Sequence, residues 1–369
     1  MQIAQIQTIP EVINILKVLV TGFLAFVLAF WITPIWTYFL YKYKIGIKIK
    51  NKSVDGKELT YVNNLHAGKS GTPTMGGLII WFSVAVLVLI SHFAFPFLAR
   101  WFEIDFISRL DFFSRPQVWL PLFALVSAGI LGLVDDFMSV KGCGSNKGGG
   151  MRFAMRFWWL LIIAGVGAWW FFSKLGWDQI HIPAIGDFSI GLWYIPLFIF
   201  VILFSAISSN ETDGLDGLNG GILAIAFSSF ALISFFQNKM DLAAFCAAIG
   251  GALLAFLWFN IYPARFFMGD TGAVSLGATL GVVAMLTNSA IILFIIMFIY
   301  ILESGSVVIQ LSSKKLFSRK VFLSAPIHHH FEAKGWPETK VTIRFWIITI
   351  IMALIGVIMG ILGGGRYHQ

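Results

Sequence analysis

Residues 192–236 read LWYIPLFIFVILFSAISSNETDGLDGLNGGILAIAFSSFALISFF, and the fold follows from this stretch. Two uncharged apolar runs, 192–208 and 218–236, lie on either side of a short polar segment, Asn210 to Asp216. An apolar segment of about 17 to 25 residues is long enough to cross the hydrocarbon of a bilayer as a helix. The stretch therefore predicts two membrane-spanning helices joined by a polar turn at one membrane face.

The rest of the chain repeats this pattern. Hydrophobic residues make up 58% of the 369 residues and charged residues 12%, with a mean hydropathy of +0.84. A soluble domain of this composition would have too little polar surface to cover its core. We predict one all-α, polytopic membrane domain over residues 1–369, with ten spans at 14–40, 75–95, 117–134, 157–173, 192–208, 218–236, 242–260, 271–287, 290–311 and 342–362.

Five polar clusters interrupt the apolar sequence, each in the connection that follows an odd-numbered span. A chain that crosses a bilayer repeatedly returns to the same side after every second crossing. All five clusters are therefore expected on one membrane face, where they can form a single site. The clusters are His66 to Thr74, Asp135-Asp136, Asn210 to Asp216, Asn260 to Asp270, and His328 to His330.

The basic residues predict which face this is. Lysine and arginine gather in the first, third and ninth connections, at 42–69, 141–156 and 314–340, whereas the even-numbered connections have far fewer. The positive-inside rule places the odd-numbered connections, and so all five clusters, in the cytoplasm, with both termini external. The net charge of +8 agrees with a partnership with the lipid bilayer. Nucleic acid is not expected as a partner, because the lysines flank spans instead of forming a separate basic domain.

The carboxylates in these clusters predict a cation site. Asp135 and Asp136 follow the third span, Asp270 precedes the eighth, and Asp213 and Asp216 would share a helix face if their segment begins the sixth span. Any one of them could be a solvated helix cap, but several on one face repel each other unless a cation or a proton compensates them. A hard divalent cation such as Mg²⁺ suits oxygen ligands and a phosphate substrate.

Two other patterns are weaker. Gly68-Lys69-Ser70 looks like the end of a phosphate-binding P-loop, but Asn63 stands where the first glycine should be and no strand precedes it, which excludes a Walker ATPase. Three consecutive histidines, 328–330, cannot all point at one zinc ion from a helix, and imidazoles that bind or protonate phosphate fit the other clusters better. Cys143 and Cys246 form neither a disulfide framework nor a zinc motif.

Six motifs together resemble phospho-N-acetylmuramoyl-pentapeptide transferase, a family of the polyprenyl-phosphate N-acetylhexosamine-1-phosphate transferases, from about residue 40 to the C-terminus. The triple histidine with Lys-Gly-Trp-Pro-Glu is specific to the muramoyl-pentapeptide branch, whereas the aspartate motifs are shared across the superfamily. The motifs are Gly71-Thr-Pro-Thr-Met-Gly-Gly77, Val134-Asp-Asp136, Asn210-x-Thr-Asp-Gly-Leu-Asp-Gly-Leu218, Asn260-x-Tyr-Pro-Ala264, Phe267-Met-Gly-Asp270 and Pro326-Ile-His-His-His-Phe-Glu-Ala-Lys-Gly-Trp-Pro-Glu338.

The resemblance implies transfer of phospho-MurNAc-pentapeptide from UDP-MurNAc-pentapeptide to undecaprenyl phosphate in the bacterial cytoplasmic (inner) membrane, giving lipid I and UMP, by a homodimer that uses Mg²⁺. Four residues would be catalytic: Asp135, Asp136, Asp270, which would also hold the metal, and His328. The residues that would bind the substrates are Lys69, Thr74, Asn210, Asp213, Gly214, Leu215, Asp216, Asn260, Phe267, Met268, His329 and His330.

This sequence departs from the family pattern at several positions. Glu211 replaces an apolar residue, Ser139 stands where a lysine commonly follows the Asp-Asp pair, and Arg156 stands where the family generally has a lysine. Arginine keeps the charge but changes its geometry. The stretches 48–65 and 142–150 are also atypical.

The mechanism has two candidates. A phosphate monoester has its second pKa near about 6, so the lipid phosphate is largely a dianion that barely needs a general base. We favour direct in-line attack, with Mg²⁺ neutralising the leaving UMP and Asp135 steering the nucleophile. A two-step route through an aspartyl-phosphate is the alternative. Outside this activity, a cation- or proton-coupled transporter, a membrane scaffold and the related N-acetylglucosamine-1-phosphate transferase stay open.

Glu303 is the one carboxylate placed inside a predicted span. A charge there costs about 2.5 to 3.5 kcal/mol even on translocon scales, so a compensating group is expected. One interpretation is a hydrogen-bonded residue that steadies helix packing. The other is that Ser304-Gly305-Ser306 bends the ninth span and opens a groove for the polyprenyl chain, with Glu303 anchoring the bend.

Overall fold

The computed structural model describes residues 2–46, 69, 71–102, 118–144, 146 and 149–363, with side chains from residue 12 onward. The predicted stretches 48–65 and the residues His66 and Ser70 lie outside this part of the chain. Helices dominate, and the only described strands form a two-stranded antiparallel hairpin, β1 (Gln179–Ile182) and β2 (Gly186–Ser189). The all-α polytopic class is confirmed.

Nine helices in the described residues are long and apolar enough to cross a membrane, and a bent helix pair makes a tenth candidate. Each of the ten corresponds to one predicted span. They are α1 (Gln2–Lys42), α3 (Leu78–Leu89) continued by the π-helical η2 (Ile90–Ala94) and α4 (Phe95–Phe102), α6 (Trp119–Lys141), α7 (Phe153–Lys174), α8 (Tyr194–Thr212) preceded by the 3₁₀ turn η4 (Gly191–Trp193), α9 (Leu218–Phe236), α10 (Met240–Asn260), α11 (Gly269–Leu286), the pair α12 (Ala290–Ile296) and α13 (Phe298–Phe317), and α15 (Glu338–Leu362).

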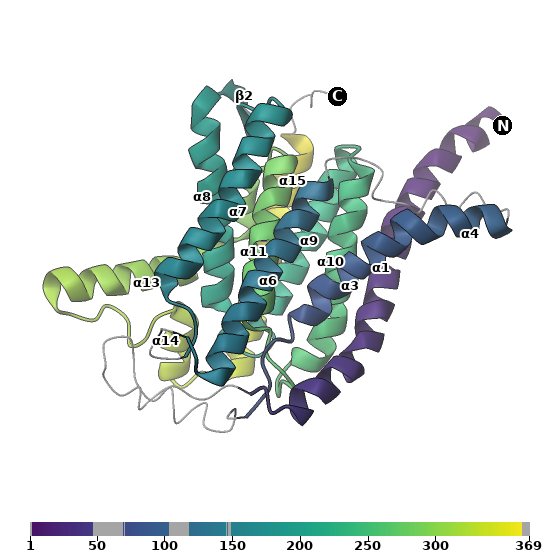
Figure 1. Ribbon diagram of the computed structural model, residues 1–369. Helices are drawn as coiled ribbons and strands as arrows, with labels where there is room; N and C mark the ends of the chain where they lie inside the picture. The colour runs from purple at the N-terminus through teal and green to yellow at the C-terminus, as the bar shows by residue number, and fades with distance from the viewer. Residues whose placement is uncertain are drawn as a thin grey trace.

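The ninth span does not bend where the sequence suggested. Its two helices meet at Met297 with a bend of 79°, and α13 then runs sideways out of the bundle (Figure 1). The predicted bend at Ser304 to Ser306 is wrong, because these residues lie within α13. Their hydroxyls are used without interrupting the helix: Ser306 donates to the Glu303 carbonyl, and the Ser304 hydroxyl lies 2.8 Å from the Ser208 hydroxyl of α8.

Helix α11 forms the centre of the bundle, and α6 and α8 pack closely against it (Figure 1). Glycines allow this approach. A Cβ atom at Gly132 would lie 2.2 Å from the Asp270 carbonyl oxygen, and one at Gly277 would lie 2.5 Å from the Ser205 carbonyl oxygen. Small residues at such contacts let membrane helices pack backbone to backbone. The close packing brings the ends of α6, α8 and α11 together.

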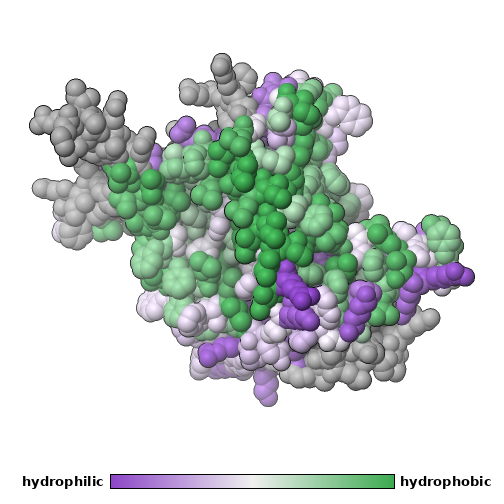
Figure 2. All heavy atoms as spheres, turned by 180° about the vertical axis from the view of Figure 1, so that it is seen from behind, coloured by the Kyte–Doolittle hydropathy of each residue, from purple (hydrophilic) through white to green (hydrophobic). Residues whose placement is uncertain are grey.

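The outer helices expose large apolar side chains. Trp31, Trp158 and Ile351 are all more than half exposed and lie on α1, α7 and α15. Figure 2 shows a continuous hydrophobic surface over the upper and middle part of one face, with most of the hydrophilic residues gathered below it. Such a surface matches a lipid-facing belt with one polar end.

The two ends of the bundle differ in content. At one end, the hairpin residue His181 contacts Asn288 and the Gly363 carbonyl, and α1 begins and α15 ends at this side (Figure 1). At the opposite end lie the connections that follow the odd-numbered spans, joined to one another by the hydrogen bonds described below. The alternation predicted from the span count therefore places the described parts of the polar clusters at a common end.

Candidate active site

The segment 73–77 and the segment 267–270 are bound to each other through their backbones. Phe267 donates to the Pro73 carbonyl at 2.8 Å, and Gly76 and Gly77 donate to the Phe267 and Met268 carbonyls at 2.9 Å each. Gly269 has a φ of +72°, and a Cβ atom there would lie 2.4 Å from Asp136 and 2.6 Å from the Thr74 hydroxyl. Only glycine fits this position, so the Phe-Met-Gly-Asp motif needs its glycine to place Asp270.

Asp136 caps the N-terminus of α11. Its carboxylate accepts hydrogen bonds from the backbone amides of Asp270 and Thr271, at 3.2 and 3.0 Å, and from the Thr271 hydroxyl at 2.6 Å. A carboxylate at this position satisfies amides that have no partner within the helix and lies at the positive end of the helix dipole. Asp136 is buried and has both oxygens engaged. It therefore fixes the position of Asp270.

Asp135 and Asp270 share one guanidinium. Nη1 of Arg156 lies 3.1 Å from Asp135 and 2.5 Å from Asp270. The other Asp270 oxygen accepts from the Asn210 amide, and the other Asp135 oxygen accepts from the Met151 amide at 2.6 Å. We call Asp135, Asp270, Arg156 and Asn210 the acidic centre. Its residues come from α6, α7, α8 and α11, and three of the four were predicted site residues.

The donor atoms of the acidic centre suit Mg²⁺. That ion binds proteins through one or two carboxylates and completes its octahedron with water and substrate phosphate oxygens, and Asp135 and Asp270 are two such carboxylates. No group of three or more histidine, cysteine or acidic side chains in the described residues could hold a metal ion by itself. The shared Arg156 guanidinium lies between the two carboxylates, so it provides the positive charge that a metal ion would otherwise supply.

Lys69 lies at a second centre of charge. Its ammonium is 2.7 Å from Asp216 and 2.5 Å from Glu338, and it lies 5.7 Å from the centroid of the Phe267 ring. Burial would lower the pKa of Lys69, but the charges and hydrogen bonds of Glu338 and Asp216 outweigh this and raise it. Lys69 is therefore charged. We call Lys69, Asp216, Glu338 and Phe267 the lysine junction.

Asp213 lies between the two centres. Its carboxylate accepts from the Gly269 amide at 3.1 Å, which ties the loop after α8 to the start of α11. Burial, with the nearby charges of Asp270 and Asp216, raises the pKa of Asp213 to about 7, although the Gly269 amide and His328 act in the opposite direction. The expectation that Asp213 and Asp216 share a helix face is wrong, because α9 begins only at Leu218 and the two carboxylates point to different partners.

Three predicted substrate-binding residues are buried and make their contacts within the protein. Asn260 accepts from the Gly217 amide at 3.1 Å and donates to the Phe266 carbonyl at 2.8 Å, so both ends of its side-chain amide are engaged. Met268 is fully buried and its sulfur accepts from Asn219. Leu215 is also buried. In this structure these residues shape the loops around the site, whereas Phe267 is partly exposed.

The three histidines point to three different partners. His328 is buried and lies 3.0 Å from Glu303 through Nδ1. His329 lies 2.7 Å from Glu332, and His330 accepts from the Leu323 amide at 3.1 Å. The expected partner of Glu303 is thus His328, and Glu303 faces the protein interior. His328 also lies against Gly214, where a Cβ atom would be 2.3 Å from Nε2.

Sequence reasoning did not assign a site role to several residues that the structure places there. Glu338 was part of a family motif, and Arg156 was noted only as a departure from a lysine. Arg156 could have been found from the sequence, because it is a basic residue in the first turn of the helix that follows the Asp-Asp pair and the third connection. The family motif was the signal for Glu338, whereas Thr271 had none, because its partner Asp136 is distant in sequence.

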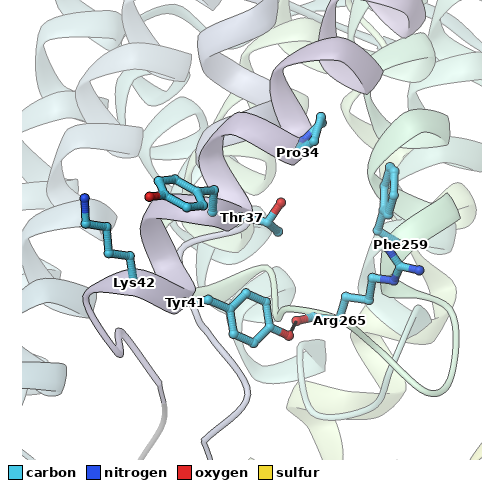
Figure 3. A pocket seen from close by; sticks show the side chains of 7 residues that line it. Pro34, Thr37, Tyr41, Lys42, Phe259 and Arg265 are labelled. Atoms are coloured by element: carbon cyan, nitrogen blue, oxygen red, sulfur yellow. Dashed lines mark hydrogen bonds between the residues drawn. The ribbon is translucent and has the colours of Figure 1, made fainter.

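A separate groove of about 620 Å³ lies at the end of α1 (Figure 3). The Tyr41 hydroxyl donates to the Arg265 carbonyl at 2.8 Å across it, and the Arg265 guanidinium lies 5.6 Å from the Phe259 ring centroid. Its other lining residues are Pro34, Thr37, Tyr38 and Lys42. None of the predicted site residues lines this groove, so the chemistry of the acidic centre and lysine junction is located elsewhere.

An all-α bundle of apolar helices with acidic and basic groups clustered at one end is compatible with a membrane-embedded enzyme. Residues 118–288, which include the acidic centre and the loops 210–216 and 260–270, match the family model for glycosyl transferase family 4. Residues 69–80 match signature 1 of phospho-N-acetylmuramoyl-pentapeptide-transferase. The family that the sequence motifs indicated is thereby confirmed, and the chain is a glycosyl-1-phosphate transferase of this type.

Proposed function

We propose that this protein transfers phospho-MurNAc-pentapeptide from UDP-MurNAc-pentapeptide to undecaprenyl phosphate, forming lipid I and UMP in the bacterial inner membrane. The observation that carries the proposal is the junction of two charge centres at one end of a membrane bundle. The Gly269 amide, next to Asp270 of the acidic centre, donates to Asp213, which lies in the same loop as Asp216 of the lysine junction, so the two centres are neighbours. A water-soluble nucleotide sugar and a membrane-bound lipid phosphate can meet only at such a membrane face.

The two centres suit different parts of the reaction. Asp135 and Asp270 lie beside the reacting phosphates in the proposal, and Asp135 steers the lipid phosphate or takes its residual proton. Phe267 offers a ring face to the uracil, and Lys69 supplies a cation for the phosphates next to it. Because the acceptor is already largely dianionic, direct attack on the sugar-linked phosphorus needs little more from the protein than position and charge.

Mg²⁺ is part of the proposal, held by Asp270 with Asp135 beside it, and it would neutralise charge on the leaving UMP. Arg156 must then move from between the two carboxylates or remain as a second cation facing the phosphates. Asn210 keeps one Asp270 oxygen in place through its side-chain amide. The cytoplasmic side for this face follows from the basic connections, and the homodimer stays a prediction from the family resemblance.

The test is release of UMP by the purified protein with Mg²⁺, a polyprenyl phosphate and one nucleotide sugar at a time. We expect turnover with UDP-MurNAc-pentapeptide and none with UDP-N-acetylglucosamine. Asp270→Asn, which keeps size but removes charge, should reduce Mg²⁺-dependent turnover by a factor of about 10² or more, while its melting temperature shows that it is folded. Wild-type turnover by folded Asp270→Asn, or turnover with UDP-N-acetylglucosamine alone, would contradict the proposal.

A further inference from the structure

Glu303 and His328 form a fully buried pair that joins two helices. Glu303 lies on α13, and His328 lies on the short helix α14 (Ile327–Ala333). The His328 ring Nδ1 lies 3.0 Å from one Glu303 oxygen, and the His328 backbone amide donates to the same oxygen at 3.4 Å. Both residues are 0% exposed. The pair therefore holds the triple-histidine helix to the bent ninth span.

Each partner keeps one polar atom without a hydrogen bond in the described part of the chain. These atoms are Oε1 of Glu303 and Nε2 of His328, both buried. Buried polar atoms nearly always have a partner, and leaving one without costs stability. The unpartnered Nε2 indicates a group that is kept for a ligand.

Nε2 points at the loop 213–216, whose residues the family resemblance gives as substrate-binding, and we assign this loop to the donor nucleotide. A Cβ atom built on Gly214 would lie 2.3 Å from Nε2, so the nitrogen edge of the ring faces the backbone between Asp213 and Asp216. The residue next to Glu303 contacts the end of α8 just before this loop, because the Ser304 hydroxyl donates to Glu211 at 2.5 Å. Ser304 of α13 and His328 of α14 thus contact the two ends of the segment 211–214.

We infer that Glu303 is a positioning residue for the transfer reaction, an inference that rests on the proposed function. Its carboxylate accepts the Nδ1 proton of His328, which fixes the tautomer and the rotation of the ring. Nε2 is then directed at the loop beside Gly214, where the sugar-phosphate side of the donor binds. Glu303 itself touches no substrate and acts only through His328.

Two substitutions at Glu303 separate its charge from its hydrogen bond. Glu303→Gln keeps the size and an acceptor but removes the charge, and Glu303→Leu removes both. We expect kcat/KM for UDP-MurNAc-pentapeptide to fall by about 10- to 100-fold in Glu303→Leu, by analogy with the loss seen when a group that orients a metal-binding histidine is removed, with a smaller loss in Glu303→Gln. KM for the polyprenyl phosphate should stay within about twofold, because the pair faces the donor side.

A double-mutant cycle tests whether Glu303 acts through His328. In a His328→Leu background, Glu303→Leu should cause no further loss of kcat/KM, because residues that work as one unit are not additive. Ser306→Ala is the matched control: Ser306 is buried on the same helix and donates only to the Glu303 carbonyl. This variant should retain wild-type kinetics. Additive losses in the cycle would overturn the inference.

A measurement without turnover separates this inference from the proposed function. In ¹⁵N-histidine-labelled protein, assigned by comparison with His328→Leu, the His328 signal should show a proton on Nδ1, and Glu303→Leu should change its position. Wild-type protein that releases no UMP from any nucleotide sugar would defeat the proposed function and leave this readout intact. A His328 signal with hydrogen on Nε2 only, or wild-type kcat/KM in folded Glu303→Leu, would overturn the role of Glu303.

Discussion

At the scale of single residues, the charge of the acidic centre depends on one guanidinium. Nη1 of Arg156 contacts Asp135 and Asp270 together, and no second nitrogen of the guanidinium is needed for these two contacts. Two carboxylates that share a site repel each other unless a positive charge compensates them. Because a lysine nitrogen could make the same two contacts, the arginine at this position is compatible with a role that the family usually gives to lysine.

Removal of Arg156 should strengthen Mg²⁺ binding in the absence of substrate. In Arg156→Gln, the two carboxylates lose their cation, so Mg²⁺ should raise the melting temperature more than it does in the wild type. A tenfold gain in affinity adds up to about 1.4 kcal/mol of stability at saturating Mg²⁺. Arg156→Lys should respond like the wild type. Addition of Asp270→Asn to Arg156→Gln should abolish the gain, and an equal Mg²⁺ response in all variants would show that Arg156 does not compete with the ion.

Asp213 should make stability depend on pH between about 4 and 7. The pKa of its carboxyl is raised to about 7 by burial and by nearby acidic charges, compared with about 3.9 for an unfolded aspartate. Within this interval the folded state binds more protons than the unfolded state, so the Asp213 contribution to stability falls as pH rises, and it is constant above about 7.

Asp213→Asn should remove this contribution, since its amide oxygen can still accept from the Gly269 amide. The difference in melting temperature between the variant and the wild type should therefore shift in favour of the variant as pH rises from 4 to 7. Thermal unfolding in detergent over this pH range measures it. A difference that does not change with pH would mean that Asp213 titrates normally.

At the scale of elements, close packing of the helix ends places the site. The N-terminus of α3 meets α11 at Gly77, where a Cβ atom would lie 2.2 Å from the Gly272 Cα. Backbone atoms cannot move aside as a flexible side chain can. The approach of these two helices keeps the segment 73–77 bonded to 267–268, and so it keeps Thr74 next to Gly269.

Gly77→Ala should therefore destabilise the protein by about 1–3 kcal/mol, the usual cost of overpacking, and should reduce turnover because α3 must shift away from α11. Gly165→Ala is the matched control, since Gly165 lies inside α7 and a Cβ atom there would meet nothing within 4 Å. This control should unfold at or slightly above the wild-type temperature. Equal melting temperatures for the two variants would contradict the packing account.

At the scale of the whole molecule, the nine candidate spans and the bent pair in the described residues arrange the connections into two sets. His181 contacts both Asn288 and Gly363 at one end, and Gln237 and Lys239 donate to the Thr287 and Leu286 carbonyls at the same end. The charge centres lie at the other end. The helices α12 and α13 meet at Met297 with a bend of 79°. Together they take the chain to the site end of the bundle, so we count the pair as one span.

Reporter fusions should show this arrangement directly. A reporter inserted near Lys320 should read cytoplasmic, and one near Asp178 should read external, because the basic residues follow the odd-numbered spans. A reporter near Asn238 should also read external. Opposite labelling at Lys320 and Asp178 would leave the site on the wrong side for a cytoplasmic nucleotide sugar and would refute the proposed function.

The sequence by itself determined the membrane class, the order of the ten spans, the common end of the polar clusters and the family. These follow from hydropathy, alternation and local motifs, all of which act within a short length of chain. Only the tertiary structure decided which groups pair. Arg156 joins Asp135 to Asp270, Lys69 joins Asp216 to Glu338, and Glu303 holds His328, each across a large separation in sequence. Such pairs depend on how helices pack, which no local pattern records.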